Sequence, residues 1–223
     1  MDYLSGIVED ISQNMCSGNL RDTIEKIKEL LQKYPNMCLF QKLLGDLLYL
    51  QGHTHDAIEI FEELVDLKPK LTPALYALGV AYYRAGRLRK AIEKFEEIIR
   101  IDPNLNMAYY WLGISYRHLG EVGKSIAAYK KLIEESPHSE IASYHLAAVY
   151  IFKKNYREAI KYLTQLSETS PENAEVFYRL GLCYHNIGNY EEAVKHYKKA
   201  LELNPDNTRC ADMLDLIVHV DEP

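Results

Sequence analysis

Apolar residues recur along this chain at helical spacing, in pairs of segments separated by a glycine and closed by a proline. The same skeleton appears as LYALGVAYYRAGRLRKAIEKFEEIIRIDP, YYWLGISYRHLGEVGKSIAAYKKLIEESP and VFYRLGLCYHNIGNYEEAVKHYKKALELNP. Apolar residues three and four apart share one face of a helix. Gly86, Gly120 and Gly188 can take the positive φ that ends a helix. Each unit is therefore predicted to be a helix hairpin.

Prolines give the period of the repeat. They lie at positions 35, 69, 103, 137, 171 and 205, each 34 residues after the last. Proline lacks an amide donor and pushes the preceding residue out of the helical region, so it closes a hairpin. A regular period of this length indicates an array of stacked hairpins.

Five columns recur when each unit is counted from residues 4, 38, 72, 106, 140 and 174. The seventh and eighth positions read Leu44 Gly45, Leu78 Gly79, Leu112 Gly113, Leu146 Ala147 and Leu180 Gly181. The eleventh reads Leu48, Tyr82, Tyr116, Tyr150 and Tyr184, and the twentieth Ala57, Ala91, Ser125, Ala159 and Ala193. The twenty-fourth reads Phe61, Phe95, Tyr129, Leu163 and Tyr197. Small residues let two helices cross closely, and the aromatic rings fill the space beside them.

This pattern resembles the tetratricopeptide repeat (TPR) family, whose motif is a 34-residue helix-turn-helix. The resemblance implies an all-α fold, a right-handed α-α superhelix, formed as one domain over 1–223. Its repeats would be 4–37, 38–71, 72–105, 106–139, 140–173 and 174–207. The first is degenerate, with Ile11, Asn14 and Thr23 in place of glycine, tyrosine and alanine. A capping helix is expected at 208–220, with Ala211, Leu214 and Val218 facing back and Asp215 where glycine would continue the array.

Composition narrows the class of partner. The 223 residues carry a formal net charge of -6, which argues against nucleic acid as the main partner. No window approaches the roughly 18 apolar residues of a membrane span, so no membrane insertion is expected. Cys16, Cys38, Cys183 and Cys210 show no zinc or disulfide spacing. We interpret them as reduced thiols of a cytoplasmic protein.

The resemblance also implies where a partner would bind. First helices line the concave groove, with positions two, five, nine and twelve pointing into it. Position five is Lys42 and then four tyrosines, position nine is mostly apolar, and Tyr109 and Tyr116 are assigned to the core. The candidate groove residues are Lys42, Tyr76, Val80, Tyr83, Arg84, Tyr110, Trp111, Ile114, Arg117, His118, Tyr144, His145, Ala148, Ile151, Tyr178, Arg179, Leu182 and His185.

Three alternatives stay open within this groove. The tyrosines are either a ligand platform or packing against the next helix, and Trp111 either borders the groove or is buried. Arg84, Arg117, His118, His145 and Arg179 either favour an acidic ligand or form a solvated rim. Lys42 is followed by Asp46, which would repel a carboxylate, so the family's chaperone-tail clamp is disfavoured.

Catalysis, metal binding and cofactors are not expected. His53 and His55 in GHTHD lack a third metal ligand, and His196 is placed on the solvated outer face. The chain has no phosphate loop, no GxSxG elbow and no evident cysteine-histidine pair. The predicted function is a protein-interaction scaffold that binds a peptide or helix of a partner protein in the concave groove. The alternative is self-assembly, in which the groove takes the N-terminal segment or C-terminal helix of another copy.

Overall fold

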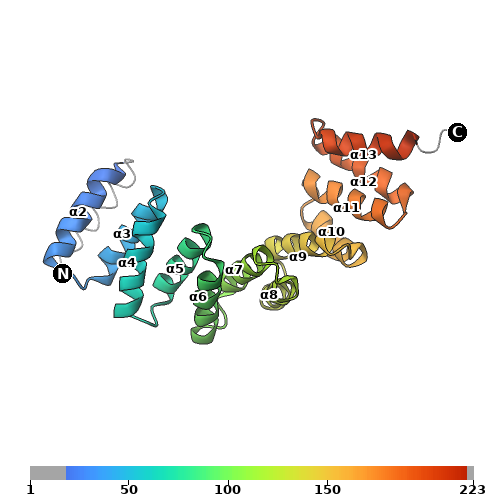
Figure 1. The fold of residues 1–223 in the computed structure, drawn as a ribbon. Coiled ribbons are helices and arrows are strands. Elements are labelled where there is room, and N and C mark those ends of the chain that lie inside the picture. Colours follow the sequence, from blue (N-terminus) through green and yellow to red (C-terminus); the bar gives the residue numbers. More distant parts are fainter. Residues whose placement is uncertain (1–18, 220–223) are drawn as a thin grey trace. The chain divides into compact units, whose positions relative to one another are not determined.

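The computed structural model describes residues 19–219, and all regular secondary structure in that range is helical. The chain divides into two compact units after Leu119. The first unit, blue to green in Figure 1, contains α2 (Leu20–Lys33), α3 (Cys38–Leu50), α4 (Thr54–Leu67), α5 (Thr72–Arg84), α6 (Leu88–Ile101) and α7 (Asn106–His118). The second contains α8 (Val122–Glu135), α9 (Glu140–Phe152), α10 (Tyr156–Thr169), α11 (Ala174–Asn186), α12 (Tyr190–Leu203) and α13 (Thr208–His219).

Helices pack against their neighbours in sequence within each unit, and α5 also contacts α3 and α7. Each of the five repeats from 38–71 to 174–207 supplies two helices at the predicted places, so the all-α solenoid of hairpins is confirmed. The grouping of all repeats into one domain stays a prediction.

The turn inside each hairpin follows a rule of backbone geometry. Between α5 and α6, Gly86 has φ +73°, its N–H donates to the Tyr83 carbonyl at 3.0 Å, and Arg87 N–H donates to the Tyr82 carbonyl at 2.8 Å. This is a Schellman motif, which needs a left-handed residue. The predicted positive φ is also found at Gly120 and Gly188. Between α9 and α10 the same place is taken by Lys154, with φ +58°.

Packing inside a hairpin depends on the pairing of positions eight and twenty-four. A Cβ atom on Gly79 would lie 2.8 Å from the Phe95 ring, and Gly181 has a similar restriction. Such a separation is far below van der Waals contact. In the repeat 140–173 these positions hold Ala147 and Leu163, and both are fully buried. A methyl group is therefore present where the facing residue is not aromatic.

Tyrosines at position eleven join consecutive repeats. Tyr116 Oη donates to Glu96 Oε1 at 2.5 Å, and Tyr82 Oη donates in the same way to Glu62. Both carboxylates lie twenty residues earlier in the chain. Tyr116 and Tyr109 are buried, as predicted.

The two ends differ from the middle repeats. Thr23 on α2 is fully buried in place of the usual alanine, and its hydroxyl donates to the Asn19 carbonyl at 2.8 Å. Ile11 and Asn14 lie outside the described residues. At the other end, α13 begins where it was predicted, and Cys210 and Ile217 are its buried residues.

The remaining predictions for α13 are mostly consistent with this packing. Ala211 and Leu214 are half-buried and Asp215 is exposed. The Val218 side chain is outside the part of the chain that the structure describes.

Candidate functional site

The first helices of the first unit present a chain of aromatic contacts. Trp111 Nε1 donates to Tyr76 Oη at 2.7 Å. The indole also stacks on Phe95 at 5.9 Å between ring centroids, and meets Tyr83 edge-on at 5.2 Å and Tyr110 at 5.6 Å. We call Tyr76, Tyr83, Phe95, Tyr110 and Trp111 the aromatic cluster. Trp111 lies at the centre of this cluster and is half-buried, so part of the indole packs against its neighbours and part remains exposed.

One end of the aromatic cluster forms an apolar pocket of about 190 Å³. Its walls are Lys42, Asp46, Tyr49, Phe61, Tyr76, Ala77 and Val80. The Lys42 ammonium lies 2.6 Å from Asp46 Oδ2 and 2.8 Å from Oδ1, so its charge is compensated. The pocket therefore offers an apolar side chain a place to bind, with a neutral ion pair at its edge.

The other end of the cluster opens into a basic pocket of about 490 Å³. Its walls are Thr54, Tyr83, Arg84, Gly86, Leu88 and His118. Tyr83 Oη lies 3.3 Å from His118 Nε2, and the rings meet edge-on. The Arg117 guanidinium lies 3.4 Å from the same imidazole nitrogen. This end of the face thus gathers hydrogen-bond donors and positive charge.

The first helices of the second unit use different contacts. The Arg179 guanidinium lies over the Tyr144 ring, 4.9 Å from its centroid, and Arg179 Nε is 2.7 Å from Glu175 Oε1. His145 stacks on Tyr129 at 5.7 Å. Its ring is therefore part of the packing and does not belong to a solvated rim.

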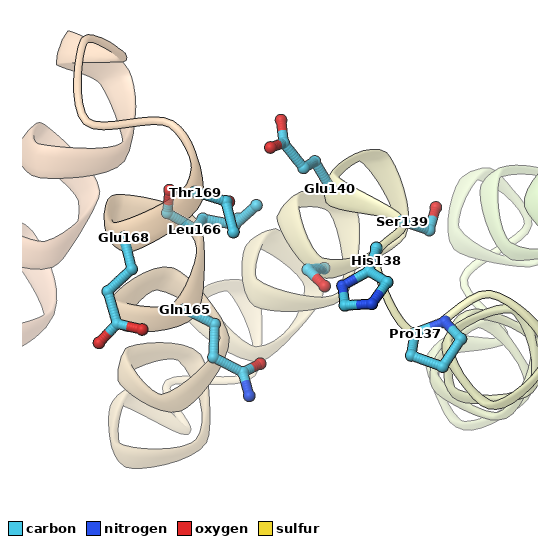
Figure 2. Close-up of a pocket in the computed structure, with 9 residues that line it drawn as sticks. Pro137, His138, Ser139, Glu140, Gln165, Leu166, Glu168 and Thr169 are labelled. Carbon is cyan, nitrogen blue, oxygen red and sulfur yellow. Dashed lines mark hydrogen bonds between the residues drawn. The ribbon is translucent and has the colours of Figure 1, made fainter.

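Two adjoining pockets lie at the start of α9. The first, about 250 Å³, is lined by Pro137, His138, Ser139, Glu140, Ser143, Gln165, Leu166, Glu168 and Thr169. Figure 2 shows His138 on the α8–α9 loop and Gln165 on α10 at the edges of this space. The second, about 240 Å³, is lined by Glu140, Ile141, Tyr144, Leu166, Ser170, Asn173 and Val176. Glu140 and Leu166 are shared, and Glu140 accepts a hydrogen bond from the Ser170 hydroxyl at 2.8 Å.

Known proteins show the same architecture. Tetratricopeptide repeat models match residues 42–106 and 76–140, 142–173, and 174–207. The chain belongs to the tetratricopeptide repeat family. TPR proteins are in general non-catalytic scaffolds, and membership of the family supports a protein-interaction scaffold as the function class of this chain. No protein with curated function matches it in sequence.

Solved TPR structures superpose over most of the chain. YrrB is 18% identical with a TM-score of 0.72, and the match covers 85% of this chain and 97% of YrrB. A MamA structure is 27% identical with a TM-score of 0.70, covering 74% and 97%. A TPR protein from Parabacteroides merdae ATCC 43184 is 17% identical with a TM-score of 0.74, covering 98% and 100%.

The predicted groove residues differ in how much surface they offer. Ile114 is only 7% exposed, so it belongs mainly to the core of this TPR unit. Half-buried side chains are Lys42, Tyr76, Val80, Tyr83, Tyr110, Trp111, Tyr144, His145, Ala148, Ile151, Tyr178, Arg179, Leu182 and His185, whereas Arg84, Arg117 and His118 are exposed. Tyr178 packs on Tyr197 and His185 on Tyr190.

Residues at position two of the repeat expose apolar surface and are not among the predicted groove residues. Leu39 is 57%, Met107 45% and Ile141 46% exposed, at the starts of α3, α7 and α9. Their shared place in the 34-residue register was the signal that could have identified them. Ile141 also lines a pocket together with Tyr144.

Burial shifts the pKa values of two ionisable groups near these faces. Burial raises the pKa of Tyr110, and the neighbouring Tyr83 raises it further. Burial also raises the pKa of Cys183 to about 12, although Arg179 acts in the opposite direction. The Cys183 thiol therefore stays protonated and is a poor nucleophile.

His196 corrects a prediction. It was assigned to the solvated outer face, but its ring stacks on Tyr184 at 5.3 Å and Phe177 at 6.1 Å. Burial lowers its pKa, while Glu192, 3.5 Å away, raises it. Its charged neighbours in the sequence suggested an exposed position, but α12 orients this residue toward α11.

His53 and His55 do not face a common metal site. His53 Nδ1 lies 3.6 Å from Asp56, and His55 Nδ1 lies 3.3 Å from the Arg87 guanidinium. Over residues 19–219, no group of three or more His, Cys, Asp or Glu side chains could hold a metal ion. No helix in the described part of the chain is long and apolar enough to cross a membrane.

Proposed function

We propose that this TPR protein binds a peptide or helix of a partner protein along its first-helix faces, in the concave groove expected for the family. The observation that supports this most directly is the apolar pocket beside Tyr76 and Val80, which the aromatic cluster extends. Aromatic side chains bury a large area at low conformational cost and often dominate binding. An extended ligand would place one apolar side chain in the pocket and lie across Trp111.

Two further features favour the same function. Met107 and Leu39 expose apolar surface at the starts of first helices. Both residues occupy position two of their repeats, so each adds apolar area to a first-helix face that a partner could bury. YrrB, which has a similar fold, is described as a TPR protein with an unusual peptide-binding site. The same architecture can therefore hold a peptide.

The test is capture of partners from native extract by the full chain. We expect the double variant Val80→Asn, Leu182→Asn to lose specific partners. Each substitution replaces a partly exposed apolar side chain of a first helix with a polar amide. Ile114 is left unchanged, because a substitution in the core would affect folding. The matched control is Leu67→Asn with Ile101→Asn, which changes two exposed apolar residues at the ends of second helices. Equal capture by both double variants would contradict groove binding, provided that circular dichroism shows intact helices.

Self-association is the second candidate. Leu216 on α13 is 55% exposed, so this helix offers apolar surface beyond its own packing. The N-terminal segment that could serve the same purpose lies outside the described residues. Light scattering over a concentration series separates the two functions. A monomer at high concentration would exclude assembly, whereas a dimer that Leu216→Asn dissociates would support it.

A further inference from the structure

The basic pocket contains positive charge that the protein does not compensate locally. None of its lining residues is acidic. Within residues 19–219, Arg84 makes no ion pair with a carboxylate. Arg117 lies against His118, and nearby Arg87 lies against His55. The carboxylate of Asp56 is close to His53, at 3.6 Å.

This arrangement is unusual for the chain. The formal net charge is -6. In the described part of the chain, most lysines that form an ion pair do so with a glutamate or aspartate of the same helix, as in Lys28–Glu25 and Lys131–Glu135. A neutral imidazole nitrogen can accept a hydrogen bond from arginine, as in the Arg117–His118 and Arg87–His55 contacts, but it carries no negative charge. An anion bound beside these arginines would supply the ion-pair attraction that is missing here.

The pocket also has the donors that an anion requires. The Arg84 guanidinium offers a fork of N–H groups, and the Tyr83 and Thr54 hydroxyls can each donate one hydrogen bond. His118 adds an imidazole on the opposite wall. These groups come from α4, α5 and α7, so the packing of three helices sets their spacing. Lys42, by contrast, is already paired with Asp46 in the apolar pocket.

We propose that the basic pocket binds the anionic oxygens of a side chain on the partner segment, either a carboxylate or a phosphoryl group. The partner's identity as a protein segment rests on the proposed function. Trp111 connects the two pockets, because it holds Tyr76 in the wall of the apolar pocket and contacts Tyr83 in the wall of the basic one. The favoured ligand therefore carries an apolar residue and an anionic residue, one on each side of the indole.

The first experiment uses inorganic phosphate and the full chain. Nuclear magnetic resonance titration at constant ionic strength, with chloride as the reference anion, should shift the signals of Arg84, Gly86 and His118 to saturation. Arg84→Gln should weaken phosphate binding by about tenfold, as expected for loss of a charge-assisted hydrogen bond. The matched control is Arg100→Gln, an exposed arginine in the last turn of α6. Unsaturable shifts, or equal binding by both variants, would overturn the proposal.

The same titration with acetate identifies the source of the oxygens. Tighter binding of phosphate than acetate supports a phosphorylated residue, and equal or tighter binding of acetate supports aspartate or glutamate. Binding of neither anion overturns the proposal.

Capture of the partner then separates this inference from the proposed function. Arg84→Gln should reduce capture more than Arg100→Gln, and phosphate should compete for binding. If the Val80→Asn, Leu182→Asn double variant loses the partner but Arg84→Gln does not, the groove function stands and the anion pocket plays no part in it. If phosphate saturates the pocket but the double variant keeps every partner, the anion site stands and groove binding fails.

Discussion

The first-helix faces of the two units share one register and differ in chemistry. In the first unit, Trp111 links two tyrosines, and the pocket beyond them is basic. In the second unit, Arg179 is held by Tyr144 and Glu175, and the polar pocket at the start of α9 contains Glu140 and Glu168. The two faces therefore differ in the ligand chemistry that each one favours.

The difference shows which positions of a repeat are free to vary. Position eight lies against position twenty-four in the core, so its size is restricted. Position six accepts side chains of different size and charge and holds Trp111, His145 and Arg179 in successive repeats. Position thirteen similarly changes from Arg84 to His118 to Phe152. The small-large pair at positions eight and twenty-four is repeated along the array, whereas the chemistry at positions six and thirteen changes from repeat to repeat.

The largest expected change in stability concerns Gly79 and Phe95, the packing pair that contributes its ring to the aromatic cluster. Gly79→Ala should destabilise the protein by about 1 to 3 kcal/mol, because the new methyl group overlaps the Phe95 ring. Adding Phe95→Leu should recover part of this loss, because it recreates the Ala147 and Leu163 pair. Urea unfolding measures both. A stable Gly79→Ala variant would show that the ring has room to move.

The next effect concerns a hydroxyl that differs between the units. Tyr197 occupies the position of Phe95, and its buried Oη makes no hydrogen bond within the described residues. Because a buried polar group without a partner is costly, Tyr197→Phe should stabilise the protein by about 1 kcal/mol. Tyr190→Phe, at an exposed tyrosine, is the control in thermal unfolding. A loss of stability would reveal a partner for the Tyr197 hydroxyl.

A similar or smaller change in stability is expected from the hydrogen bond between Trp111 and Tyr76, which connects the walls of the two pockets. Trp111→Phe and Tyr76→Phe both remove the 2.7 Å hydrogen bond. Their effects on unfolding free energy should therefore be non-additive, with a coupling of about 1 kcal/mol. Tyr144→Phe is the control in the second unit, where this position contacts Arg179 through its ring. Strict additivity of the first pair would mean that the hydrogen bond contributes nothing.

The smallest effect is a pH dependence in the second unit. Burial lowers the pKa of His196 in the folded state. As pH falls through the ordinary histidine value of about 6.5, the unfolded chain gains a proton that the folded chain still resists. Stability should therefore decline until pH reaches the lowered pKa, and His196→Phe should remove this part of the decline. His138→Gln, at an exposed histidine, should keep it in unfolding titrations at pH values from about 7.5 to 5.

The 34-residue period predicted the hairpins and the core because repeats contact mainly their neighbours. Tyr109 and Tyr116 could be assigned to the core from register alone, and Gly86 to a left-handed turn. The sequence predicted the exposed residues of the candidate binding face less well than it predicted the core. Ile114 shares the register of Val80 and yet is buried, whereas Ile141, at position two of its repeat, is exposed but is not among the predicted groove residues. Register places a residue on a helix face, but the size of the neighbouring side chains decides how much of it remains exposed.

The sequence by itself determined the repeat, the hairpin turns, the small and large columns and the acidic net charge, because these depend on local periodicity and composition. Only the tertiary structure decided that Trp111 donates to Tyr76, that His196 lies against Tyr184, and that Arg84 and His118 share a pocket. These contacts join residues from different helices. Their existence depends on side-chain orientation after packing, which a linear pattern does not contain.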